Sequence, residues 1–236
     1  MKVTAEQIEK LYAFTRQHYV EYYDLQTELV DHLANAIEEQ WETNPKLTFE
    51  EALQIEFKKF GVFGFMDVVD KRRGALNTKY NKLVLQHLKT FFSIPKIIGT
   101  LAAIGSVYWI LVALQRDFDQ ENNILQASFF ALILFFLVCL FILNRQNKKR
   151  NQKTEKKWLL REIIFGYSSL AGAMNIPVQF ALHLNGNHFS NGLLLFFSFL
   201  FVVLGITIYI TMVLIPAKAD QYLRETYPEY ELIENV

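Results

Sequence analysis

The sequence predicts an all-α protein in which a small cytosolic helical domain precedes a four-helix transmembrane bundle. Hydrophobic residues make up 52% of the 236 residues, including 21 Phe, which is rich for a soluble protein. The excess is concentrated in residues 97–215, where long apolar runs alternate with short polar loops. We therefore divide the chain into a cytosolic helical domain at 1–90, a transmembrane domain at 91–216 and a C-terminal tail at 217–236.

Four apolar segments reach the roughly 20 residues that a helix needs to cross a bilayer. They cover residues 97–114, 124–143, 163–184 and 192–215. The first and third contain more Gly, Ser, Thr and amide residues, so we expect these two in the interior of the bundle. The third also carries a polar stripe at helical spacing, formed by Ser168, Gly172, Asn175, Gln179 and His183. Because no charged residue accompanies the stripe, interhelical packing and hydrogen bonding explain it better than a ligand or ion site.

The orientation follows from the positive charge of the loops. The loop over residues 144–162 carries eight Lys and Arg residues, the loop over 115–123 carries one, and the loop over 185–191 carries none. Since cytoplasmic loops retain Lys and Arg, we expect a location in the cell (inner) membrane with both termini in the cytoplasm.

The predicted cytosolic domain contains three amphipathic helices. Thr4 with Gln7 and Thr48 with Glu51 form capping boxes that start the first and the third helix. Asp24 is predicted as the N-cap of the second, whose apolar side chains recur every four residues at Leu25, Leu29, Leu33, Ile37 and Trp41. From about Phe65 a basic helical segment, with an interruption at Gly74 left open, leads to the membrane.

Basic side chains cluster next to the membrane. Residues 71–96 carry seven Lys and Arg and no acid, whereas residues 1–60 carry twelve acids and six bases. A position beside the membrane favours anionic lipid over nucleic acid as the ligand of such a cluster. The predicted lipid contacts are Lys71, Arg72, Arg73, Lys79, Lys82, Lys148, Lys149 and Arg150. Tyr108, Trp109 and Trp158 are predicted as anchors at the membrane surface.

One polar face of the second helix is the predicted partner-binding surface, formed by Glu28, Asp31, His32, Asn35 and Glu39. Glu28 and His32 stand four residues apart and could hold a metal ion, but a stable site needs further ligands, and no second His-carboxylate pair occurs in this domain. No nucleophile–base pair, phosphate-binding loop or cofactor motif is present in the sequence. We therefore expect neither metal nor cofactor and a protein that is not an enzyme.

The order of the predicted helices resembles that of a known family. The resemblance covers roughly residues 10–73 and is carried by Glu28 to His32, Ile37 to Glu39, Thr48 to Leu53, Phe60-Gly61 and Val68-Val69. These segments are similar to bacterial membrane proteins with a HAAS-type helical signalling domain, which are typically encoded beside PadR-type transcription regulators. Two departures are Thr43 to Lys46, where the family has a Gly-containing turn, and Val62, where a Pro often follows the Gly.

The resemblance implies a regulatory or interaction protein whose cytosolic domain binds a protein partner, with a PadR-type regulator as the candidate. The rival is a small transport component, either a carrier or a permease-like subunit without its own ATPase. The expected partners are membrane lipid and one cytosolic protein, with a homo-oligomer left open.

In the tail, Tyr222, Leu223, Tyr227, Pro228 and Tyr230 fit either a short helix that returns to the cytosolic domain or a flexible end.

The orientation can be tested with single cysteines in a Cys139→Ala background. We expect Arg150→Cys to be protected from an impermeant thiol reagent in intact cells and Asn187→Cys to react, because eight basic residues oppose transfer of the central loop. The starting Cys139→Ala protein is the control for background labelling. Labelling of residue 150 from outside would reverse the orientation.

Overall fold

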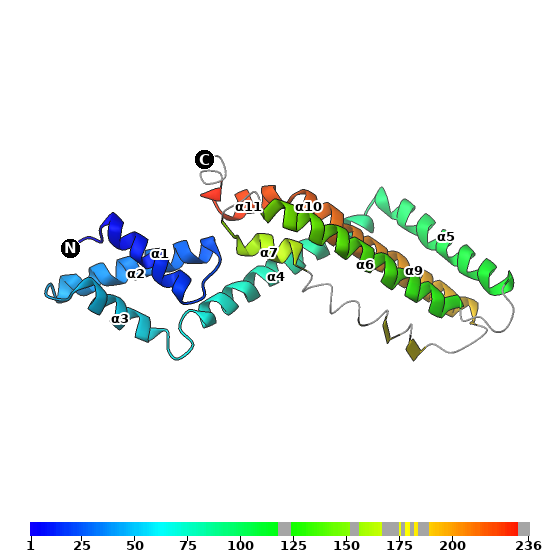
Figure 1. The fold of residues 1–236 in the computed structure, drawn as a ribbon. Coiled ribbons are helices and arrows are strands. Elements are labelled where there is room, and N and C mark those ends of the chain that lie inside the picture. Colours follow the sequence, from blue (N-terminus) through cyan, green and yellow to red (C-terminus); the bar gives the residue numbers. More distant parts are fainter. Residues whose placement is uncertain are drawn as a thin grey trace.

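The computed structural model describes residues 1–117, 124–151, 156–166 and 189–230, together with Asn175, Val178, Gln179, Leu182 and His183. Over this part of the chain all regular structure is helical, which confirms the all-α prediction. The molecule is elongated, with α1 (Ala5–Gln17), α2 (Tyr23–Thr43) and α3 (Phe49–Lys59) at one end and the long apolar helices at the other (Figure 1). We refer to α1–α3 as the N-terminal helices.

Both predicted capping boxes are confirmed. The Thr4 hydroxyl accepts from the backbone N–H of Gln7 at 3.3 Å, and the Gln7 side chain accepts from the backbone N–H of Thr4 at 2.9 Å. Thr48 and Glu51 make the same pair of bonds at 3.2 and 3.0 Å. Each box satisfies backbone donors that a helix start leaves without partners, so two helix starts are encoded locally.

The N-terminal helices bury their apolar faces against one another. Leu11, Leu25, Leu33 and Ile37 are completely buried. An aromatic cluster fills the space between α1, α3 and the start of α4, with ring centroids 4.1 to 6.1 Å apart, formed by Phe14, His18, Phe57, Phe60 and Phe65. These ring contacts add to the stabilisation that burial of the aliphatic side chains provides.

A single long helix, α4 (Met66–Phe91), connects the N-terminal helices to the membrane half (Figure 1). It runs without a break through Gly74, which settles the possibility of an interruption that the sequence left open. Its start is set by Gly61 and Gly64, whose φ angles of 77° and 55° let the chain turn after α3 in a conformation that other residues rarely adopt.

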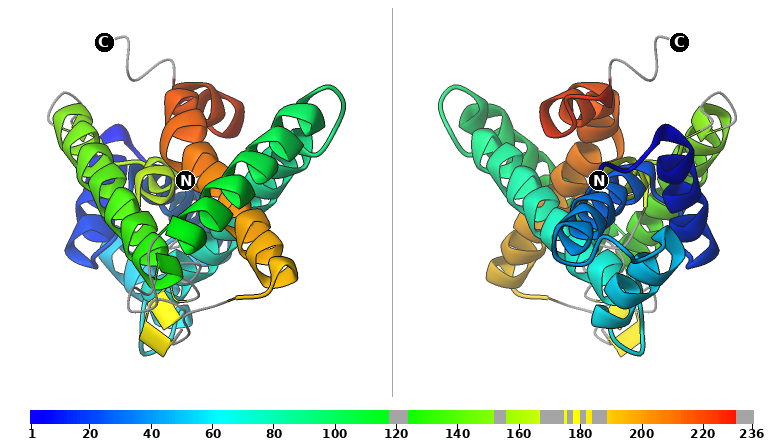
Figure 2. Two further views of the ribbon diagram at one scale, coloured as in Figure 1. Left: turned by 90° about the vertical axis from the view of Figure 1, so that its right-hand side faces the viewer. Right: turned by 90° about the vertical axis from the view of Figure 1, so that its left-hand side faces the viewer.

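Among the described residues, three helices are long and apolar enough to cross a membrane, and we conclude that this is a membrane protein. They are α5 (Lys96–Asp117), α6 (Ile124–Asn151) and the continuous run of α9 (Asn191–Tyr209), η1 (Ile210–Leu214) and α10 (Ile215–Ala217). The π-helical turn η1 precedes Pro216, whose missing N–H interrupts the regular bonding pattern. Viewed end on, α5 crosses α9, and α6 lies to one side of that pair (Figure 2).

The expected interior position of the first span is wrong among the described residues. Only 11% of the α5 span is buried, against 39% of the span that contains α9. Trp109 on α5 is 72% exposed, as expected of a side chain that faces lipid. The Gly and Ser residues of α5 therefore do not mark a buried helix, because α9 supplies the central packing surface.

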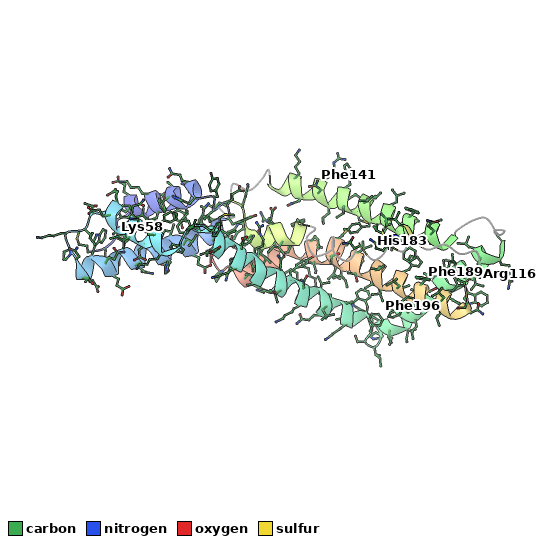
Figure 3. The ribbon with its side chains drawn as sticks, turned by 90° about the horizontal axis from the view of Figure 1, so that it is seen from below. Lys58, Arg116, Phe141, His183, Phe189 and Phe196 are labelled. Carbon is green, nitrogen blue, oxygen red and sulfur yellow. The ribbon has the colours of Figure 1, made fainter. Side chains whose placement is uncertain are left out.

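The end of the bundle far from the N-terminal helices is held by a side-chain amide. Gln115 donates to the Phe189 carbonyl at 3.2 Å and accepts from the Phe189 backbone N–H at 3.1 Å. Leu111, Phe129, Leu194 and Phe197 form a small buried cluster beside it. Figure 3 shows Phe189 close to Arg116 at this end and Lys58 at the opposite end of the molecule. The end of α5 and the start of α9 therefore lie on the same side of the membrane.

The third predicted span does not begin as an unbroken helix. Ile163 to Phe165 belong to the short helix α7 (Leu159–Phe165), and Gly166 is extended, with φ −85° and ψ 138°. A Cβ atom at Gly166 would lie 2.4 Å from the carbonyl oxygen of Glu162, so any side chain here would force the backbone to shift. Most of residues 167–184 lie outside the described residues.

The Gly166 contact gives a stability prediction. Gly166→Ala should destabilise the fold by about 1 to 3 kcal/mol, because the added carbon overlaps a backbone carbonyl that cannot move freely. Gly74→Ala is the matched control, since no atom lies within 4 Å of the added carbon and alanine favours helix by about 1 kcal/mol. Apparent melting temperatures in detergent should fall for the first variant and stay or rise for the second. Equal changes in the melting temperatures of Gly166→Ala and Gly74→Ala would contradict the close contact at Gly166.

Candidate functional site

The N-terminal helices are fixed to the membrane half through the buried carboxylate of Asp24, which is 6% exposed. One oxygen accepts from the backbone N–H of Leu159 at 3.1 Å, and the other accepts from the hydroxyl of Tyr227 at 2.7 Å. These partners lie 135 and 203 residues away in the sequence. One side chain therefore joins α2, the start of α7 and the segment after α11 (Ala219–Thr226). We call this contact the Asp24 junction.

The junction caps two helix starts reciprocally. Asp24 satisfies the N–H of Leu159, the first residue of α7, while the Lys157 carbonyl accepts from the N–H of Tyr23, the first residue of α2, at 2.7 Å. The prediction that Asp24 is the N-cap of α2 is wrong, because Tyr22 holds that position and makes no side-chain cap. The carboxylate instead lies close to two positive helix ends, which favours its negative charge.

An aromatic layer covers the junction. Trp158 is 1% exposed, and its ring lies 5.5, 5.0 and 5.2 Å from the rings of Tyr23, Tyr227 and Tyr230. The prediction of Trp158 as a membrane-surface anchor is therefore wrong, since the ring is enclosed by protein. The buried guanidinium of Arg161 donates to the Tyr230 hydroxyl and lies 3.7 Å from the Asp220 carboxylate.

This layer also decides between the two interpretations of the tail. Residues 219–226 form the helix α11, and Leu223, Tyr227 and Tyr230 are buried. Through residue 230 the tail is therefore packed against the N-terminal helices and α7 and is not a flexible end.

Three of the predicted lipid contacts also contact protein side chains. Arg72 lies 3.8 Å from Glu28, Arg73 donates to the Tyr22 hydroxyl at 3.1 Å, and Lys79 donates to Thr226 at 3.0 Å. These contacts brace α4 against α2 and α11. Lys71, Lys82 and Lys148 are exposed, and the side chains of Lys149 and Arg150 lie outside the described residues.

Burial sets the protonation of the junction. Desolvation raises the pKa of the Asp24 carboxyl above its ordinary value, against the lowering effects of the Tyr227 hydroxyl, the Leu159 N–H and the Arg72 charge. Burial, and then the charge of Asp24, raise the pKa of Tyr227, so its hydroxyl keeps the proton that it donates.

The predicted partner-binding side chains lie together on one exposed face of α2. Glu28, Asp31, His32, Asn35 and Glu39 are all exposed, opposite the buried Leu25, Leu29, Leu33 and Ile37. Glu28 is engaged by Arg72 at one end of the face, whereas no ion pair of Asp31 or Glu39 with a described residue is found. We call these five residues the acidic face.

The polar stripe is described only in part. Asn175, Gln179 and His183 are exposed, and Ser168 and Gly172 lie outside the described residues. His183 Nδ1 lies 3.1 Å from the Gln179 carbonyl. The inward orientation predicted for the stripe is thus not seen for its three described members. No group of three His, Cys, Asp or Glu side chains close enough to hold a metal occurs within the described ranges.

Local patterns in the sequence do not reveal the Asp24 junction. An Asp before an apolar helical repeat is an ordinary helix-start signal, and Trp158 beside a basic loop resembles a membrane anchor.

Comparison with protein-family models, with curated proteins and with solved structures found no match to this chain.

The Asp24 junction predicts an unusual pH dependence. The folded protein holds the Asp24 proton more tightly than the unfolded chain, so this residue contributes stability that is present below its ordinary pKa of about 3.9 and is lost as the pH rises through the raised folded pKa. The melting temperature of the native protein relative to Asp24→Asn should therefore rise as the pH is lowered from 7 towards about 4. Taking the difference cancels the titration of other carboxylates. A difference that is constant over this range would contradict the buried, proton-retaining environment of Asp24.

Proposed function

We propose that this chain is a membrane-anchored regulatory protein whose cytosolic helical domain binds a protein partner through the acidic face of α2, with a PadR-type transcription regulator as the candidate. The proposal is supported by two separate roles of α2. Its start is bound into the Asp24 junction, while its exposed side keeps acidic side chains that the core does not require. A partner on this face would contact a helix that is attached directly to the membrane half.

In the proposed topology the chain crosses the inner membrane four times, and both termini lie on its cytoplasmic side. Gly166 follows α7, which packs against α4 and α11 beside the N-terminal helices, whereas Phe189 lies at the far end with Gln115. Gly166 and Phe189 therefore lie at opposite ends of the bundle, and this supports a fourth crossing between them. The eight basic residues of the central loop support its cytoplasmic side.

The charge of the face indicates the chemistry of the partner. Glu28, Asp31 and Glu39 carry negative charge along one side of α2, and such a surface attracts basic partners and accelerates their association. A regulator held here would be kept at the membrane and away from DNA, whose backbone competes for the same basic residues.

The partner proposal is tested with the double variant Asp31→Lys/Glu39→Lys in the full-length, membrane-embedded protein. These two positions are chosen because Glu28 pairs with Arg72, and reversing Glu28 would disturb the brace between α2 and α4. Capture of the PadR-type regulator encoded nearest to this chain should be lost. The melting temperature should change little, since exposed substitutions usually alter stability by less than about 0.5 kcal/mol.

Glu9→Lys/Glu50→Lys is the matched control, with the same change in net charge on exposed positions of α1 and α3. This control should retain capture. Equal loss of capture in both double variants would mean that net charge, and not the acidic face, determines binding. If the native protein captures no such regulator, the regulatory proposal is contradicted and a transport component becomes the better interpretation.

A further inference from the structure

A groove of about 420 Å³ lies between α4, α7 and α11, outside the Asp24 junction and the acidic face. Its apolar surface is formed by Tyr80, Leu83, Leu160, Ile164 and Tyr222. Its polar rim is formed by Thr78, Lys79, Lys82, Gln86, Glu225 and Thr226. An apolar floor with a charged rim fits an amphiphilic ligand better than a fully polar one, and the volume lies within the range of small-molecule sites.

The rim carries uncompensated positive charge. No ion pair of Lys79 or Lys82 with a described carboxylate is found, and the Lys79 ammonium donates only to the uncharged hydroxyl of Thr226. Glu225 is the single acid on the rim and is engaged by Gln221 at 2.8 Å. The groove therefore favours a ligand with a negatively charged polar group.

Two further lysines, Lys96 and Lys218, lie near the groove. His87, one helical turn from Leu83, contacts the Tyr222 hydroxyl at 3.0 Å. Burial lowers the pKa of His87, and the charges of Lys218 and Lys96 lower it further. Lys96 begins the first span, and Lys218 directly follows the last. The groove therefore lies on the side of the molecule where the first span begins and the last span ends.

We propose that this groove is a binding site for one anionic phospholipid, with the phosphate at Lys79 and Lys82 and the upper part of the acyl chains on Leu83, Leu160 and Ile164. A membrane lipid is favoured over a soluble anion by the position beside the ends of two spans, by the apolar floor and by two lysines without an ion pair to a described carboxylate. Basic sites between helices at a membrane surface recognise anionic head groups in this way. The site requires only that the protein lies in a membrane and does not depend on the proposed partner.

The test is native mass spectrometry of the full-length protein in detergent, titrated with phosphatidylglycerol or phosphatidylcholine. One phosphatidylglycerol should bind at least about fivefold more tightly than phosphatidylcholine. Lys82→Gln should raise the dissociation constant for phosphatidylglycerol about fivefold, because one lysine near a bilayer surface contributes about 1 kcal/mol. Ala75→Phe, which fills the groove from an exposed position of α4 without changing charge, should abolish the preference.

Lys148→Gln is the matched control, because Lys148 is an exposed lysine at the same end of the bundle but does not line the groove. It should bind phosphatidylglycerol like the native protein. Equal weakening by Lys148→Gln and Lys82→Gln would overturn the proposal in favour of diffuse attraction to the surface. Equal binding of the two lipids, or displacement of phosphatidylglycerol by inorganic phosphate at the same concentration, would also overturn it.

Discussion

The carboxylate of Asp24 is the constraint on which the arrangement of this protein depends. A buried carboxylate costs several kcal/mol unless donors replace the water that it loses, and removing one donor leaves that cost uncompensated. Here the donors are the N–H of Leu159 and the hydroxyl of Tyr227, which belong to segments far apart in the sequence. One buried polar contact therefore holds the three segments together, and it is lost if any of them moves away.

This requirement has a consequence for how the two halves communicate. The N-terminal helices reach the membrane half along the continuous helix α4 and also through the junction with α7 and α11. Two connections restrict rotation of α1–α3 where a single helix would allow it. The acidic face and Asp24 lie on the same helix, so a displacement of α7 or α11 at the membrane would move the proposed partner surface. Such coupling would require the junction to break or re-form as α7 or α11 moves.

Features that depend on nearby residues could be predicted from the sequence. Both capping boxes, the apolar stripe of α2 and three of the spans rely on spacing within one helix, and the structure contains them. The acidic face follows from the same periodicity, because residues on the opposite side from Leu25 and Leu29 must be exposed. The all-α class required nothing more than these patterns.

The features that sequence reasoning missed depend on distant partners. Asp24 looks like a helix cap until Leu159 and Tyr227 are placed beside it, and Trp158 looks like a membrane anchor until three tyrosines enclose it. The end of α7 at Gly166 reflects a close approach to the Glu162 carbonyl that hydropathy does not register. The exposure of α5 depends on which helix occupies the centre, and composition alone suggested the wrong one.

We expect the Asp24 junction to hold the N-terminal helices rigidly on the membrane half. A direct measurement is the distance distribution between spin labels at Glu42→Cys and Lys148→Cys, both exposed, in a Cys139→Ala background in lipid. We predict one narrow distribution that broadens when Tyr227→Phe removes the hydroxyl from Asp24. A distribution that is already broad with Tyr227 in place, or one that Tyr227→Phe leaves unchanged, would contradict the claim.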